Sequence, residues 1–141
     1  MIGAAIARAR VRGAYAALNR RDLDGFLAAW AEDAVFVFPG EISASGTFRG
    51  KPEIRRWFTV FLDTFPELTF TLRQVALSRP YTPGADNEVA VHWDIDLVHR
   101  NGRRNRNHGV TVVTLRRARV VHACDYIFDT GRRFREVWGE D

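Results

Sequence analysis

The chain has 141 residues, of which 46% are hydrophobic and 27% charged, with a formal net charge of +4 and a single cysteine. This length and composition predict one soluble globular domain spanning residues 1–141, and they exclude a disordered chain and an internal disulfide. No apolar run approaches the roughly 18 residues of a membrane-spanning helix, and the N-terminus lacks a signal-peptide pattern. We therefore expect a cytoplasmic protein without a membrane partner.

The positive charge consists almost entirely of arginine, with Lys51 as the one lysine among 21 basic residues. Such an excess of arginine over lysine is typical of a genome with biased codon usage. That bias distributes arginine over the protein surface even where no function requires it. Residues 100–119 nevertheless contain seven arginines and no acid, which predicts a local positive patch. We expect a solvated hairpin there. Phosphate, an acidic protein or nucleic acid remain alternatives, and nucleic acid is not the expected partner.

The first elements are helices. Residues 4–18 place apolar side chains at helical spacing, which predicts an amphipathic helix. Asp22 is a suitable N-cap for a short second helix, whose apolar side includes Phe26 and Trp30. These two helices should form a hairpin.

A strand and a third helix follow. Residues 34–38 (AVFVF) are β-branched and aromatic, which predicts a buried strand, and a Gly- and Ser-rich loop follows at residues 41–50. Pro52 marks the first turn of a third helix with a broad apolar face, and Pro66 ends it.

The second half of the chain predicts strands only. Its apolar residues alternate with polar ones from Leu68 onward, and Asn101-Gly102 is a strong hairpin signal. A loop is predicted at 79–87, and the tail from 132 to 141 either forms a short helix or frays. The four predicted strands span 68–77, 88–100, 103–116 and 119–128.

Helices followed by a run of antiparallel strands predict an α+β domain. A twisted sheet of this length curves around the apolar faces of the helices and leaves a cavity between them. We therefore expect a cone-shaped, curved antiparallel sheet wrapped around three N-terminal helices and enclosing a pocket.

Several segments resemble a known family. The stretches YAALNRRDLDGFL (15–27), WAEDAV (30–35) and FRGKPEI (48–54) resemble the opening of the nuclear transport factor 2-like superfamily, in its SnoaL-like branch. CDYIFD (124–129) resembles the closing motif of that branch, with Ile127 inserted. The resemblance covers residues 8–130 and implies relatives such as polyketide cyclases, ketosteroid isomerases and limonene epoxide hydrolase.

The resemblance implies positions for functional groups. The isomerase base and its two oxyanion donors would fall at Phe38, Ala14 and Thr111, so those three groups are missing, and Tyr15 lies one position away from the expected tyrosine. The hydrolase and cyclase carboxylates match Asp96 and Asp125. The hydrolase arginine is replaced by Asp94, so its water-activating relay is not reproduced.

The strand at residues 88–100 has two different faces. His92, Asp94 and Asp96 share one face, and Trp93, Ile95 and Leu97 share the other. Periodicity alone favours the apolar face toward the core and the polar face toward water. The resemblance instead implies that the polar face lines the cavity and that the apolar face contacts a second copy in a homodimer.

If the polar face points inward, the cavity holds an acid–base site, because clustered carboxylates at low dielectric cannot all stay ionised. Asp125 is then the principal base and Asp96 its partner in one enclosed cavity, with Asp94, His92 and Tyr126 as further catalytic candidates. We expect neither a metal nor a cofactor. The candidate substrate-binding residues are Tyr15, Phe36, Phe38, Trp57, Phe61 and Thr111.

The sequence thus favours a cofactor-independent enzyme that acts by proton transfer on a hydrophobic small molecule, such as a polyketide or terpenoid. Cyclisation, isomerisation and hydrolysis of an epoxide remain open. The alternatives are a non-catalytic ligand-binding pocket and an adaptor that engages an acidic partner through the hairpin at residues 100–119.

Overall fold

The computed structural model describes residues 2–82 and 86–140, so residues 83–85 of the predicted 79–87 loop lie outside the described residues. Three helices are followed by a run of long strands, as predicted. In the described part of the chain, no helix is long and apolar enough to cross a membrane. The elements in chain order are α1 (Ile2–Asn19), α2 (Leu23–Leu27), β1 (Trp30–Phe38), β2 (Gly46–Arg49), α3 (Lys51–Thr64), β3 (Glu67–Leu77), β4 (Asn87–Val98), β5 (Arg104–Arg116), β6 (Arg119–Ile127) and α4 (Arg132–Val137).

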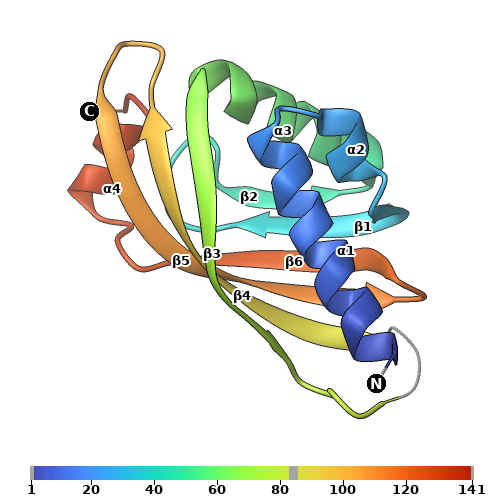
Figure 1. The fold of residues 1–141 in the computed structure, drawn as a ribbon. Helices are drawn as coiled ribbons and strands as arrows, with labels where there is room; N and C mark the ends of the chain where they lie inside the picture. The colour runs from blue at the N-terminus through green and yellow to red at the C-terminus, as the bar shows by residue number, and fades with distance from the viewer. Residues whose placement is uncertain (1, 83–85, 141) are drawn as a thin grey trace.

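Six strands form one curved, unclosed sheet in the order β2-β1-β6-β5-β4-β3. Helices α1, α2 and α3 lie against its concave side (Figure 1). The predicted α+β class is confirmed. Neighbouring strands run antiparallel, as expected, except that β1 and β6 run parallel. These strands are joined by most of the chain, which gives the long crossover that a parallel pair requires.

Two differences concern the region before α3. β1 begins at Trp30, which the helical spacing from Phe26 had placed in the second helix, because Trp30 pairs with Val120 of β6. β2 lies inside the predicted 41–50 loop and pairs with β1 at the edge of the sheet. Sheet pairing thus overrides the local composition in both segments.

The concave side of the sheet and α3 enclose an aromatic core. Trp57 of α3 packs against Phe36 and Phe38 of β1, with ring centroids 4.9 and 4.8 Å apart. The tail forms a helix, α4, whose buried Phe134 stacks on Phe38, while Trp138 packs against Phe38 with a centroid distance of 5.4 Å. The C-terminal segment therefore covers one end of the curved sheet (Figure 1).

Candidate functional site

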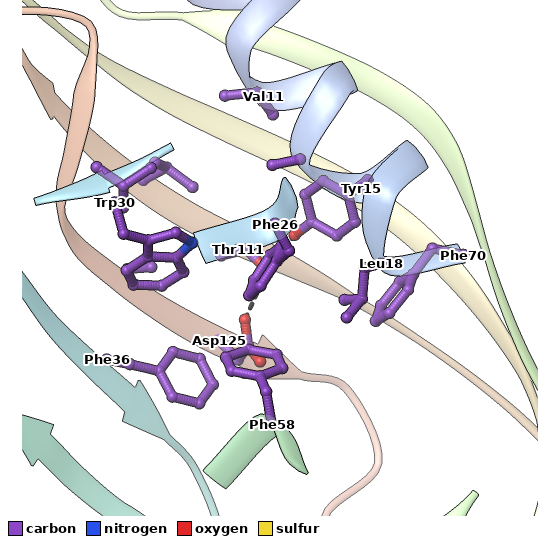
Figure 2. Close-up of a pocket in the computed structure, with 14 residues that line it drawn as sticks. Val11, Tyr15, Leu18, Phe26, Trp30, Phe36, Phe58, Phe70, Thr111 and Asp125 are labelled. Carbon is purple, nitrogen blue, oxygen red and sulfur yellow. Dashed lines mark hydrogen bonds between the residues drawn. The ribbon is translucent and has the colours of Figure 1, made fainter. Parts of the chain in front are cut away.

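A cavity lies between α1 and the concave face of the sheet. Its volume is about 50 Å³, enough for a few water molecules. Figure 2 shows its walls, which are apolar apart from four polar groups: the side chains of Tyr15, Thr111 and Asp125 and the indole nitrogen of Trp30. The fourteen lining residues are Val11, Ala14, Tyr15, Leu18, Phe26, Trp30, Phe36, Phe58, Phe70, Thr111, Val113, Val120, Ala123 and Asp125.

A bulge in β6 directs Asp125 into this cavity. The pairing of β5 with β6 shifts so that Leu115 pairs with Val120 and Thr114 pairs with His122, which leaves Val121 as an extra residue. Side chains alternate across a strand, so one extra residue is needed for both Val120 and Asp125 to face inward. Both line the cavity.

Thr111 of β5 is buried and is the centre of a hydrogen-bond network that includes the half-buried Tyr15 and Asp125. It pairs with Asp125 across the two strands, and its hydroxyl donates to Asp125 Oδ1 at 2.6 Å. The same hydroxyl oxygen accepts a hydrogen bond from the Tyr15 hydroxyl of α1 at 2.9 Å and from Trp93 Nε1 of β4 at 2.8 Å. Since a threonine hydroxyl has one hydrogen and two lone pairs, all of its hydrogen-bonding capacity is used.

Burial controls the electrostatics of this network. Removal from water raises the pKa of Asp125 from its ordinary 3.8 to about 7, although the hydrogen bond from Thr111 acts in the opposite direction. Burial and the nearby Asp125 charge also raise the pKa of Tyr15, so that Tyr15 stays neutral. Asp125 therefore exchanges a proton near neutral pH, while Tyr15 acts only as a neutral hydrogen-bonding group.

The network can support both protonation states of Asp125. When the carboxylate is ionised, the donors run from Tyr15 to Thr111 to Asp125. When it is protonated, its new hydrogen can be donated to Thr111, whose own hydrogen then turns toward the Tyr15 oxygen. Trp93 remains a donor to Thr111 in both cases, because an indole N–H cannot accept. Asp125 can thus keep one orientation as an acid and as a base.

Gly109 makes room for the indole of Trp93. The two residues pair directly across β4 and β5. A Cβ atom at Gly109 would lie 2.9 Å from the Trp93 ring and 2.5 Å from the carbonyl oxygen of Tyr126. Only glycine therefore lets the indole lie over β5, where its nitrogen reaches Thr111.

A second cavity of similar volume, about 50 Å³, lies toward α4. Phe38, Trp57 and Phe61 line it, so these three predicted substrate-binding residues lie in the interior but not in the first cavity. Tyr15, Phe36 and Thr111 line the first cavity, as expected for a shared pocket. The residues that line both cavities are Phe58, Phe70 and Asp125.

The polar face of β4 points away from both cavities, so the expectation that it lines the pocket is wrong. Trp93, Ile95 and Leu97 are buried in the interior, and His92, Asp94 and Asp96 lie on the outer side. The alternation along β4 predicts this orientation, because burying the apolar side chains is favourable and burying His92, Asp94 and Asp96 would cost free energy.

The outer carboxylates form ion pairs instead of an acid–base site. Arg106 Nε donates to Asp96 Oδ1 at 2.8 Å, and Arg73 Nε donates to Asp94 Oδ2 at 2.6 Å. The hydrogen bond from Arg73 lowers the pKa of Asp94. Asp96 and Asp125 lie on opposite faces of the sheet, so the expected pairing of their carboxyls in one cavity is wrong.

Two further expectations change with the strand orientation. Tyr126, a predicted proton donor, is 57% exposed on the outer face of β6 and does not reach the cavity. The reason for expecting a homodimer, an outward apolar face on β4, is also removed. The seven arginines of residues 100–119 divide between the two ends of the 13-residue β5, roughly 40 Å apart at strand spacing, so one continuous patch does not form.

The sequence interpretation missed two indoles. The resemblance implies an outer face for Trp93, and helical spacing places Trp30 on the apolar side of the second helix. The alternation of β4 contained the signal for Trp93, whereas no local pattern indicated Trp30. Among the described residues, no three His, Cys, Asp or Glu side chains gather as a metal site would require.

Comparison with solved structures places the fold in a known group. A nuclear transport factor 2-like protein of unknown function from Burkholderia pseudomallei is 25% identical, with a TM-score of 0.79 over 94% of this chain and 97% of that one. A candidate polyketide cyclase from Xanthomonas campestris is 17% identical, with a TM-score of 0.74 over 96% and 98% of the two chains.

A third similar structure contains a ligand. It is a Mycobacterium tuberculosis protein in complex with estradiol-17beta-hemisuccinate, 18% identical, with a TM-score of 0.72 over 86% of this chain and 92% of that one. No curated protein matches the chain. The sequence matches the SnoaL-like domain over residues 11–123, which is most of its length, and the chain therefore belongs to the SnoaL-like domain family.

Proposed function

We propose that this protein is an acid–base enzyme that moves a proton on an apolar small molecule, with Asp125 as the group that takes and returns it. The observation that carries the proposal is the position of Asp125 in an apolar cavity, with a pKa of about 7. A general acid or base works best when its pKa lies near the operating pH. Proton transfer of this kind needs no cofactor.

The geometry supports a single carboxylate rather than a pair. Asp125 Oδ1 accepts the hydrogen bond from Thr111, and no described residue donates to Oδ2. Once an apolar substrate has displaced water from the cavity, this free carboxylate oxygen is a stronger base toward carbon acids than the same oxygen in water, because it has lost its hydration shell. Thr111 and Tyr15 hold the carboxyl in place through both halves of the reaction.

The walls favour an aromatic or alicyclic substrate. A polyketide-like or terpenoid-like ring system matches the apolar lining, and the similar proteins include a candidate polyketide cyclase and a complex with a steroid ester. Pockets for ligands of that size measure roughly 300–1,000 Å³, far more than either cavity. Such a substrate requires the rings of Phe58 and Phe70, which line both cavities, to turn aside.

A probe reaction tests the proposal without knowledge of the substrate. In 5-nitrobenzisoxazole a base removes the ring C–H proton, the C–H electron pair completes a nitrile, and the N–O bond breaks to leave a coloured phenolate. We expect the protein to accelerate this elimination, with a rate that rises with pH to a plateau around a midpoint near 7. The Asp125→Asn variant should lose the acceleration.

The matched control is Asp94→Asn, which removes a carboxylate from the outer face of the sheet and should keep the activity. Equal rates for the wild type and Asp125→Asn would contradict the proposal. Tight binding of an apolar dye by both proteins, together with that result, would favour the non-catalytic ligand-binding alternative.

A further inference from the structure

The indole nitrogen of Trp30 is a buried hydrogen-bond donor without an acceptor. Trp30 is 4% exposed, and within residues 2–82 and 86–140 its Nε1 is the one buried side-chain nitrogen or oxygen without a hydrogen-bond partner. Buried polar groups in folded proteins are nearly always paired, so each exception calls for an explanation. The other interior indoles follow the rule: Trp57 donates to the Ala44 carbonyl at 2.8 Å, and Trp93 donates to Thr111.

Three aromatic rings pack against the Trp30 indole. The Trp30 ring packs against Phe26, Phe36 and Phe58, with centroid distances of 5.6, 6.2 and 6.4 Å. None of these side chains offers an oxygen or nitrogen acceptor. The packing therefore fixes the orientation of the indole but leaves its N–H unsatisfied.

Trp30 and Asp125 line the same cavity. Figure 2 shows the Trp30 nitrogen directed into the space that the labelled side chains surround, with the Asp125 carboxyl on another side of that space. The cavity thus presents a fixed N–H donor and a proton-accepting carboxylate to whatever occupies it. These two groups fit a molecule with one hydrogen-bond-accepting oxygen and one removable proton.

We propose that the Trp30 indole N–H donates a hydrogen bond to an oxygen atom of the substrate, and that this oxygen gains negative charge when Asp125 removes the proton. This inference rests on the proposed function and narrows its substrate class to a planar apolar compound with a carbonyl, a phenol or a ring oxygen. Asp125 takes the proton, the freed electron pair moves through the substrate to the oxygen, and the Trp30 N–H stabilises the resulting anion.

The first experiment is a binding measurement that does not depend on catalysis. Phenol and toluene have similar size and shape, but only phenol carries an oxygen. In a ¹H–¹⁵N spectrum, we expect the Trp30 indole proton to move downfield with phenol and to stay near its free position with toluene. The Trp30→Phe variant assigns the signal and should bind phenol about 3- to 10-fold more weakly, which is the effect of one neutral hydrogen bond, with toluene binding changed much less.

The matched control is Phe26→Leu. It removes aromatic volume beside the Trp30 ring but leaves the N–H in place. It should preserve the downfield shift and the preference for phenol over toluene, whatever it does to the affinity for both. A loss of that preference in Phe26→Leu as large as in Trp30→Phe would overturn the inference, because packing would then explain both.

The second experiment uses the elimination of 5-nitrobenzisoxazole, in which a ring oxygen becomes a phenolate. Trp30→Phe should lower kcat roughly 10- to 100-fold, the effect of a hydrogen bond to a charged acceptor, with a smaller change in KM. An unchanged kcat in Trp30→Phe, beside an inactive Asp125→Asn, would overturn the inference and leave the proposed function standing.

The reverse failure is also recognisable. If the wild type and Asp125→Asn show the same elimination rate, the proposed acid–base function is wrong. The phenol-dependent shift of the Trp30 signal then still decides whether the cavity binds an oxygen-bearing ligand through this indole. If the Trp30 indole signal keeps its free position with both phenol and toluene, the inference is overturned.

Discussion

The cavity-facing carboxyl of Asp125 should make the stability of this protein depend on pH in a direction opposite to that of an ordinary salt-bridged acid. Its pKa is about 7 in the folded protein and close to 3.8 in an unfolded chain. Between these values the folded state binds one more proton than the unfolded state, so the free energy of unfolding falls as pH rises. The stabilising contribution is complete below about pH 4 and is lost as pH passes through 7.

The magnitude follows from the two pKa values. They differ by about three pH units, and a difference of one unit corresponds to about 1.4 kcal/mol. The wild type should therefore lose up to about 4 kcal/mol of unfolding free energy between pH 4 and pH 8 through this group. Asp125→Asn keeps an oxygen that can accept from Thr111 but cannot ionise. The difference in unfolding free energy between the two proteins should therefore shift by up to about 4 kcal/mol in favour of the variant as pH rises.

Urea denaturation at half-unit pH steps from 4 to 8 measures this difference directly. The control Asp63→Asn replaces an exposed carboxylate on α3 and should follow the wild-type profile. Parallel stability profiles for the wild type and Asp125→Asn across this range would refute the argument, because they would mean that Asp125 titrates alike in the folded and unfolded chains.

Three other substitutions test the surroundings of Asp125. Thr111→Val removes the hydroxyl that donates to Asp125, so the pKa of Asp125 should rise further in a ¹³C carboxyl titration, and stability should fall by about 1–3 kcal/mol as the Trp93 N–H loses its acceptor. Gly109→Ala forces the Trp93 ring or the β6 backbone to move, and should cost about 1–3 kcal/mol in denaturation with an altered tryptophan emission. Asp94→Asn breaks an outer ion pair with Arg73 and should change stability by less than about 1 kcal/mol, with unchanged elimination activity.

Much of the fold could be predicted because its signals are local. The hairpin at Asn101-Gly102, the cap at Asp22 and the alternation along β3 to β6 each depend on a few neighbouring residues. β2 and the first residues of β1 could not be predicted in the same way. Their hydrogen bonds come from pairing with distant strands, and a Gly- and Ser-rich segment gives no local indication of that pairing.

The residues of the candidate site could also be predicted only in part. The resemblance implies Asp125 as the base, Tyr15 and Thr111 are among the candidate substrate-binding residues, and all three meet in one network. Asp96 was transferred in the same way and lies on the opposite face. A shift of one residue in a strand exchanges its two faces, so a resemblance that locates a strand to within one residue leaves the inward set undetermined. Periodicity gave the correct orientation of β4 because burial of apolar side chains decides between the faces.

The polar groups of the interior fall into two kinds, and the difference separates the supporting structure from the candidate site. Thr111 uses every hydrogen-bonding position it has, and Trp93 has its acceptor, so these groups can stabilise the domain without a ligand. Asp125 keeps one oxygen to which no described residue donates a hydrogen bond, and Trp30 keeps a buried N–H without an acceptor, where burial makes such a group costly. A core selected for stability alone would replace either group with an apolar side chain at little loss. Two unmet polar groups of opposite character around one cavity are instead what a bound oxygen and a moving proton would satisfy.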